Sequence, residues 1–170
     1  MTLAVKNLAK SYQENGQKID VFLDLTLLME KGSFVSLIGP SGSGKSTLCN
    51  IIAGIEKPDS GQVCLDGRDI TGTTGNVGYM FQKDILLPWR TLLDNVTLGC
   101  DLKKNDKDMS RREAARWLKR FGLLEFADCY PHQLSGGMQQ RAALLRTILF
   151  GKSTLLLDEP FGALDALTRR

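Results

Sequence analysis

The most restrictive feature of the chain is a short glycine-rich segment, residues 39–47, which reads Gly-Pro-Ser-Gly-Ser-Gly-Lys-Ser-Thr. It fits the pattern G-x-x-x-x-G-K-[ST], which chance would produce in a chain of this length less than about once in a hundred. The apolar run Phe34–Ile38 before it predicts a buried parallel strand, and residues 46–55 after it predict a helix that closes near Gly54. A flexible Gly/Ser linker would explain neither the lysine nor this flanking strand and helix.

Such a loop binds phosphate because glycines let the backbone curl until successive N–H groups point at one anion. The N-terminus of the following helix adds partial positive charge. Lys45 should reach the β- and γ-phosphates of a nucleotide, and the Ser46 hydroxyl should hold Mg²⁺. The loop alone does not separate GTPases, kinases and motor ATPases. The expected nucleotide-binding residues are Gly39, Pro40, Ser41, Gly42, Ser43, Gly44, Lys45, Ser46 and Thr47.

The composition mainly excludes classes of protein and of binding site. The 170 residues are enough for one domain, and 42% hydrophobic with 24% charged residues is ordinary for a globular protein. The net charge, 22 − 19 = +3, is too small to predict a nucleic-acid partner. No apolar run is long enough to span a membrane and the N-terminus has no secretory core, so we expect a cytoplasmic protein. The four cysteines are scattered and should be reduced, and a single histidine, His132, excludes a histidine-rich metal site.

The hydrophobic pattern predicts a mixed fold. Residues 2–30 alternate as strands around a loop, Ser11–Gln17, and further short strands are expected at Gly61–Gly67, Val77–Phe81 and Thr154–Leu157. The region Pro88–Phe150 is helical in pattern. Strands that alternate with helices predict a mainly parallel α/β sheet.

The clearest helix signal starts at Ser110, which forms the pattern of a capping box with Glu113. Four apolar residues then follow at helical spacing, and Gly122 should end the helix. The remaining positions are basic, and we interpret them as a solvated face. The apolar positions are Ala114, Trp117, Leu118 and Phe121, and the basic ones are Arg112, Arg116, Lys119 and Arg120.

A second chemical signal follows the strand Thr154–Leu157, which ends in Asp158 and Glu159. In a protein with a phosphate loop, an Asp at such a strand end coordinates Mg²⁺. An adjacent Glu points the other way out of the strand and can activate water. A surface turn is the alternative, since Asp-Glu-Pro is common in turns.

The segment Leu134–Arg141, Leu-Ser-Gly-Gly-Met-Gln-Gln-Arg, resembles the signature motif of ATP-binding cassette (ABC) ATPases. It lies between the phosphate loop and the acidic pair, as in that family. Other family motifs appear in order. Tyr12 resembles the aromatic residue that stacks on adenine, Gln82 the Q-loop glutamine, Asp158-Glu159-Pro160 the Walker B end, and Gly162–Asp165 the D-loop.

The resemblance implies an α/β fold: a P-loop NTPase (RecA-like) core with an N-terminal antiparallel β subdomain and a helical signature subdomain. It divides the domain 1–170 into core and β subdomain (1–87), helical subdomain (88–150), and Walker B with D-loop (151–170). It implies catalytic roles for Glu159 as general base, Gln82 and Lys45. Asp158, Ser46 and Gln82 would hold Mg²⁺, and the further ATP-binding residues would be Tyr12, Ser135, Gly136, Gly137 and Asp165.

The family resemblance also implies partners. Two copies would pack head to tail with ATP between the phosphate loop of one and the signature of the other, and permease subunits would span the membrane. Residues 81–96 are similar to the nitrate/sulfonate/taurine type of importer, which implies a solute-binding protein and a place on the inner face of the membrane. Trp89 in this segment is equally explained as a packing aromatic. A non-transport ABC ATPase, or a nucleotide-binding fragment without turnover, are the alternatives.

Two positions depart from the family pattern. The family carries a switch histidine some tens of residues after the D-loop, whereas this sequence ends at Arg170, five residues past Asp165. We therefore expect the domain to be incomplete at its C-terminus, and His132 precedes the signature and cannot serve. Met138 stands where many relatives have Gln, which removes one polar side chain but spares Ser135 and the two glycines.

Overall fold

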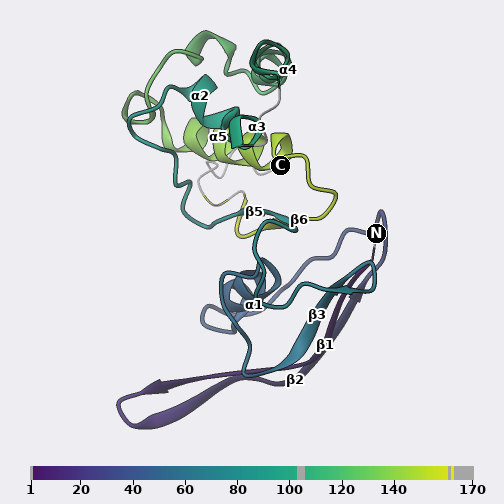
Figure 1. The fold of residues 1–170 in the computed structure, drawn as a ribbon. Helices are drawn as coiled ribbons and strands as arrows, with labels where there is room; N and C mark the ends of the chain where they lie inside the picture. The colour runs from purple at the N-terminus through teal and green to yellow at the C-terminus, as the bar shows by residue number, and fades with distance from the viewer. Residues whose placement is uncertain (1, 103–105, 161, 163–170) are drawn as a thin grey trace. The chain divides into compact units, whose positions relative to one another are not determined.

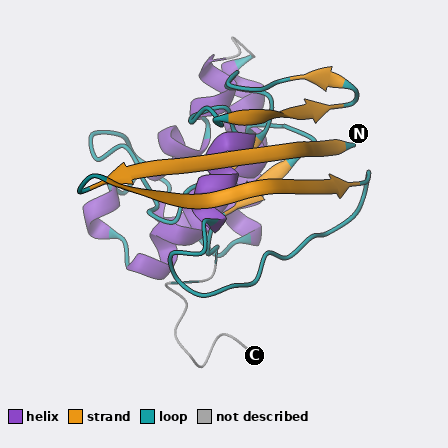
Figure 2. Cartoon of the chain, turned by 90° about the horizontal axis from the view of Figure 1, so that it is seen from below, coloured by secondary structure: helices purple, strands orange, loops and turns teal. Residues whose placement is uncertain are grey.

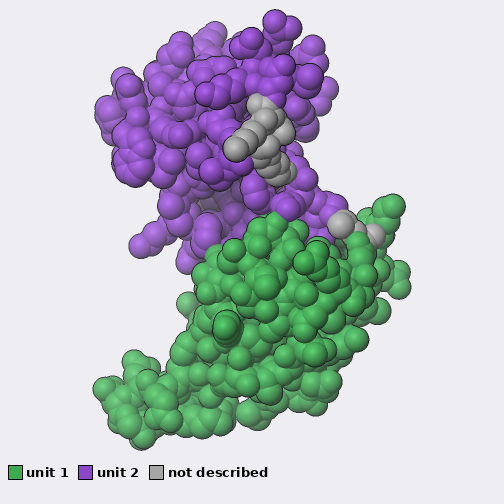
Figure 3. Space-filling view, viewed as in Figure 1, with its two compact units in different colours: residues 1–77 green, residues 78–170 purple. Residues whose placement is uncertain are grey.

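The computed structural model describes residues 2–102, 106–160 and 162. Its contacts divide the chain into two compact units, Met1–Val77 and Gly78–Arg170 (Figure 3). The boundary between the units lies at Val77/Gly78, ten residues before the boundary at 87/88 that the motifs predict.

The first unit is built on a four-stranded antiparallel sheet in the order β2-β1-β3-β4 (Figures 1 and 2). The long strands β1 and β2 form a hairpin that turns at Asn15 and Gly16, with φ of 49° and 77°. Two left-handed residues are what a type I′ turn requires, and Asn-Gly is its preferred pair. The predicted loop Ser11–Gln17 is therefore wrong, because the strands continue to this two-residue turn. The strands are β1 (Leu3–Glu14), β2 (Gln17–Met29), β3 (Ser60–Leu65) and β4 (Arg68–Asp69).

One helix, α1 (Lys45–Ile52), belongs to this unit and buries its apolar side. Ile51 of α1 is fully buried, as are Val5, Leu8 and Val63 of the sheet. The helix ends at Ala53, and Gly54 follows with φ of 75°. The predicted helix with its stop near Gly54 is confirmed.

The apolar run Phe34–Ile38 differs from its prediction. The structure gives these residues no strand, and Phe34 and Ile38 are 91% and 94% exposed. A buried parallel strand needs hydrogen-bonded neighbours, and every described strand ladder of the first unit is antiparallel and lies elsewhere. The run is irregular chain between β2 and the phosphate loop.

The second unit contains a parallel strand pair and a group of helices (Figure 1). Strands β5 (Gly78–Met80) and β6 (Leu155–Leu157) pair in register, Gly78 with Leu155 and Met80 with Leu157. The prediction of a mainly parallel sheet is wrong for the described strands, because β5 and β6 are their only parallel pair and the four-stranded sheet is antiparallel. The helices are α2 (Leu92–Val96), α3 (Leu98–Leu102), α4 (Lys107–Arg120) and α5 (Gly136–Leu149), with 3₁₀ turns η1 (Leu124–Phe126) and η2 (Pro131–Gln133).

The helices enclose one apolar core, as the helical pattern of residues 88–150 predicts. Trp117 and Phe121 pack against this core from α4, and Met138 packs against it from α5. Met138 therefore packs against the core at the position where many relatives have a polar glutamine. The buried core residues are Leu92, Val96, Ala114, Leu118, Leu123, Leu134, Ala142 and Leu145.

Helix α4 begins one turn earlier than predicted. Its N-cap is Asp106, whose carboxylate accepts from the N–H groups of Asp108 at 2.9 Å and Met109 at 3.1 Å. Ser110 is instead a buried residue inside the helix. The capping-box prediction is wrong because Asp106, an equally strong capping residue, satisfies the first free amides before Ser110 is reached.

The end of α4 is as predicted. Gly122 has φ of 66°, its N–H donates to Lys119 O, and the N–H of Leu123 donates to Leu118 O at 2.8 Å. These two bonds make a Schellman motif, in which a left-handed residue ends the helix and satisfies its last carbonyls.

Three of the four cysteines are buried, and all four are free, as predicted. In the part of the chain that the structure describes, no helix has the length and apolar character needed to cross a membrane.

Gly122→Ala tests the left-handed helix end. A Cβ at this position would meet only Arg141 Nη1, at 3.7 Å, so the cost is conformational and not steric. We expect the free energy of unfolding, measured by urea titration, to fall by about 1–2 kcal/mol. Arg112→Ala on the exposed face of α4 should change it by less than about 0.5 kcal/mol. Equal stabilities of the two variants would contradict this account.

Candidate functional site

The phosphate loop of the first unit depends on two left-handed glycines. Gly42 and Gly44 have φ of 80° and 89°, a region that residues with a side chain rarely adopt. A Cβ on Gly44 would lie 2.5 Å from Val21 Cγ1 and 2.9 Å from Phe22 Cζ. Gly44 thus allows the start of α1 to approach β2 while the loop turns.

Lys45 folds over the loop that precedes it. Its Nζ donates to the carbonyl oxygens of Gly39 and Pro40, both at 2.9 Å, and lies 3.4 Å from Ser43 Oγ. Helix α1 starts at Gly44 without a side-chain cap. A cation beside the uncapped N–H groups of a helix start is the donor set that a polyphosphate chain requires. The residues present therefore fit a nucleotide phosphate.

Tyr12 lies in the same unit within a polar cluster. Its hydroxyl donates to Glu56 Oε1 at 2.6 Å, and Lys10 Nζ lies 5.1 Å from its ring centroid. Lys10 also forms an ion pair with Glu56 at 3.0 Å. Burial is the largest cause and raises the pKa of Tyr12. The hydrogen bond with Glu56 raises this pKa further, whereas a hydrogen bond with Thr47 lowers it.

The acidic pair follows β6 in the second unit. Asp158 is buried and its N–H donates to Met80 O at 3.0 Å, which extends the parallel ladder by one bond. Glu159 is exposed and has φ of 50°, a left-handed conformation that is uncommon for a residue with a side chain. The two carboxylates therefore leave the strand end in different environments, one buried and one open to solvent.

Gln82 and Glu159 lie in direct contact. The Nε2 of Gln82 donates to Glu159 Oε2 at 2.9 Å. The backbone of Glu159 is held as well, because Gln140 Nε2 and the N–H of Gly162 donate to its carbonyl oxygen at 3.2 and 3.1 Å. Gln140 belongs to α5, so the helix that begins at the signature also fixes the backbone of the acidic pair.

The signature residues lie at the start of α5. Ser135 is its N-cap, and the Oγ accepts from the N–H of Met138 at 3.3 Å. Gly136 and Gly137 form the first turn, with their backbone at the N-terminus of a fourteen-residue helix. Asp165 of the predicted set lies outside the described residues.

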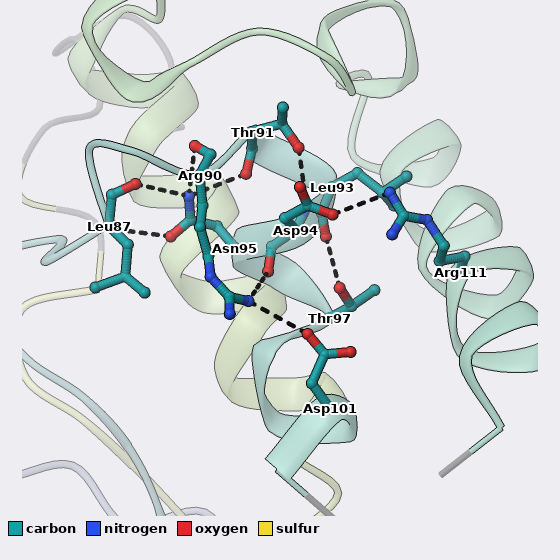
Figure 4. A network of polar contacts seen from close by, with 9 residues as sticks. All are labelled: Leu87, Arg90, Thr91, Leu93, Asp94, Asn95, Thr97, Asp101 and Arg111. Carbon is teal, nitrogen blue, oxygen red and sulfur yellow. Dashed lines mark hydrogen bonds and ion pairs between the residues drawn. The ribbon is translucent and has the colours of Figure 1, made fainter. Parts of the chain in front are cut away.

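Asn95 was missed by the sequence analysis. It is fully buried in α2, its Oδ1 accepts from the N–H of Leu87 at 2.7 Å, and its Nδ2 lies 3.0–3.1 Å from the carbonyl oxygens of Leu87, Arg90 and Thr91 (Figure 4). One amide thus fixes the turn that leads from the Gln82 segment into α2. The sequence feature that could have identified Asn95 is a single amide residue within an apolar helical pattern.

The structure brings together part of each predicted set within a unit. In the first unit, Tyr12 is close enough to Thr47 for the threonine to lower its pKa. In the second unit, Gln82 donates a hydrogen bond to Glu159. His132 stacks on Tyr130, with ring centroids 6.0 Å apart, in the 3₁₀ turn before the signature.

Comparison with known proteins identifies the family. The family model described as ABC transporter matches residues 22–162. A dimeric structure of a post-hydrolysis state of the ATP-binding cassette MJ0796, bound to ADP and Pi, superposes with a TM-score of 0.88 at 36% identity and covers 98% of this chain and 77% of that one. The chain has the fold of an ABC cassette, and it belongs to the ABC transporter family.

The sequences of curated relatives match this chain over nearly its whole length. The taurine import ATP-binding protein TauB of Pseudomonas aeruginosa is 46% identical over 98% of this chain. An uncharacterized ABC transporter ATP-binding protein of Methanocaldococcus jannaschii is 45% identical, and the aliphatic sulfonates import ATP-binding protein SsuB of Bacillus thuringiensis is 40% identical. The chain spans 64%, 62% and 66% of the lengths of these three relatives.

The Tyr12 cluster yields a titration test. The pKa of Tyr12 should lie above the ordinary value of about 10, and Glu56→Gln should lower it, because a carboxylate partner favours the neutral phenol. A pKa raised by folding implies stabilisation that is present below pH ~10 and is lost as the pH rises through the raised value. NMR titration of the Tyr12 ring measures the pKa directly. The exposed Glu14→Gln serves as the control, and an unchanged pKa in Glu56→Gln would refute the assigned contact.

Proposed function

We propose that the chain is the ATP-binding and ATP-hydrolysing part of an ABC importer that takes up a small solute through a permease. The observation that supports this most is the contact between Gln82 Nε2 and Glu159 Oε2, made at the ends of two paired parallel strands. The roles of these two residues are proposed from the family resemblance, and the contact between them supports that proposal.

The loop of the first unit supplies phosphate binding. N–H groups at the start of α1 and the Lys45 ammonium neutralise charge on the β- and γ-phosphates. Gly42 and Gly44 keep that backbone close to the anion because they carry no side chain. Tyr12 presents an aromatic ring, 40% exposed, on which adenine would stack.

The acidic pair and Gln82 supply the reaction chemistry. Glu159 accepts the proton from the attacking water as general base. The hydrogen bond from Gln82 orients that carboxylate, since it occupies one oxygen and leaves the other for water. Bound Mg²⁺ would neutralise charge on the phosphates, and oxygen donors of the type it prefers are present in Ser46, Gln82 and Asp158.

The partners and the location are proposed from the family resemblance. Two copies of the chain would enclose ATP between the phosphate loop of one copy and Ser135, Gly136 and Gly137 of the other, at the N-terminus of α5. Asp165 would take part in that interface. Closure of the dimer and its release after hydrolysis would drive the permease, with a solute-binding protein delivering cargo. We propose that the protein lies on the cytoplasmic face of the membrane as a peripheral subunit.

The solute class is proposed from the relatives. TauB is named for taurine import and SsuB for aliphatic sulfonates import. We infer a small solute of the taurine or sulfonate type as the cargo, with nitrate as the third type that the resemblance of residues 81–96 implies. Its choice lies with the permease and the binding protein, because the ATPase binds nucleotide and not solute.

Glu159→Gln tests the assigned base. The amide cannot accept a proton from water, so we expect the rate of ATP hydrolysis, measured by phosphate release, to fall on the order of 10²- to 10⁴-fold while ATP still binds. Glu125→Gln, an exposed acid in η1, should hydrolyse ATP at the unsubstituted rate. Equal turnover by the Glu159 and Glu125 variants would refute the role of Glu159.

A further inference from the structure

The segment that carries Gln82 is held by a side chain of α5. Arg146 Nη1 donates to the carbonyl oxygen of Ile85 at 2.7 Å, and Nη2 donates to that of Asp84 at 2.9 Å. These carbonyls belong to consecutive residues, two and three positions after Gln82. The planar guanidinium presents its donors in a fixed fork, which suits two neighbouring acceptors.

The backbone at this contact is strained. Ile85 has φ of 42°, and a β-branched residue in the left-handed region is a genuine outlier. Its side chain is 54% exposed, so burial of the side chain does not explain the conformation. Such strain persists only where the surroundings hold it, and the shorter of the two Arg146 bonds ends on the carbonyl of this residue.

The partly buried environment of Arg146 favours these hydrogen bonds. Burial lowers the pKa of Arg146, and the charge of Asp84 opposes that shift. A half-buried cation is costly unless its donors are paired, so the carbonyls of Asp84 and Ile85 also stabilise Arg146.

The far end of the segment is fixed independently. Asn95 holds both the N–H and the carbonyl oxygen of Leu87 (Figure 4). Residues 84–87 are therefore anchored at two points, by Arg146 and by Asn95. Only Lys83 lies between this anchored stretch and Gln82, so the anchored backbone determines how far the Gln82 amide reaches towards Glu159.

We infer that Arg146 is a positioning residue for Gln82: its bonds to the carbonyls of Asp84 and Ile85 hold the segment in the conformation from which Gln82 meets Glu159. The inference rests on the proposed function for its catalytic consequence. Its structural content, the placement of residues 82–87 by Arg146, stands apart from any turnover.

Backbone order parameters from NMR relaxation test the structural content without ATP, because they report the order of N–H groups whether or not these are hydrogen-bonded. In Arg146→Gln, the order parameters of residues 83–86 should fall from about 0.85 to below about 0.6, while those of α4 keep their values. Arg146→Lys keeps the charge without the fork and should restore only part of the order. Arg111→Gln, which removes an ion pair with Asp94 in the same unit, is the charge-matched control and should leave residues 83–86 unchanged. Unchanged order parameters at 83–86, or a loss of order throughout the unit, would overturn the inference.

A double-mutant cycle with Gln82→Ala tests the consequence. Arg146→Gln should lower kcat for ATP on the order of tenfold to a hundredfold with KM unchanged, as misplacement of a catalytic group does. In the Gln82→Ala background it should cause no further loss, because the group it positions is gone. Equal losses in both backgrounds would overturn the inference. If the unsubstituted protein hydrolyses no ATP, the proposed function fails, and the order parameters alone decide the role of Arg146.

Discussion

Parallel pairing of β5 with β6 is the constraint on which the chemistry of the second unit depends. Neighbouring parallel strands end at the same edge, so the residues that follow them leave the sheet together. The bond from the N–H of Asp158 to Met80 O carries the ladder one step beyond β6. Gln82 and Glu159, 77 positions apart in the sequence, consequently meet through a 2.9 Å hydrogen bond.

Helix α5 holds the residues that follow the two paired strands in place. Helix α5 contributes three separate functions: its N-terminus carries Ser135, its middle carries Gln140 against the Glu159 backbone, and its last turns carry Arg146 against the segment after β5. A single fourteen-residue helix thereby connects the signature, the acidic pair and the glutamine. Burial of Leu145, Ala142 and Ala143 in the same helix keeps these polar groups in fixed positions.

Motifs with local chemistry were predictable from the sequence, and contacts between distant residues were not. The helix start after the glycine-rich loop, the helix stop at Gly122 and the strand before Asp158 follow from residue type and spacing. The Ser110 cap failed because Asp106 competes for the same amides, and the strand Phe34–Ile38 failed because strand formation needs a partner that an apolar run does not specify. Asn95 and Arg146 bind backbone atoms of other segments. These contacts could not be predicted, because every residue has a backbone carbonyl and the sequence does not show which carbonyl is bound.

The most direct test of the account is equilibrium binding of MgATP to the protein, measured by calorimetry beside Lys45→Ala. The account predicts saturable binding by the unsubstituted protein and at least a tenfold loss of affinity in the variant, since about 1.4 kcal/mol of phosphate contact corresponds to that factor. Equal affinities of the two proteins, or no binding by either, would contradict the assignment of residues 39–47 as the nucleotide site.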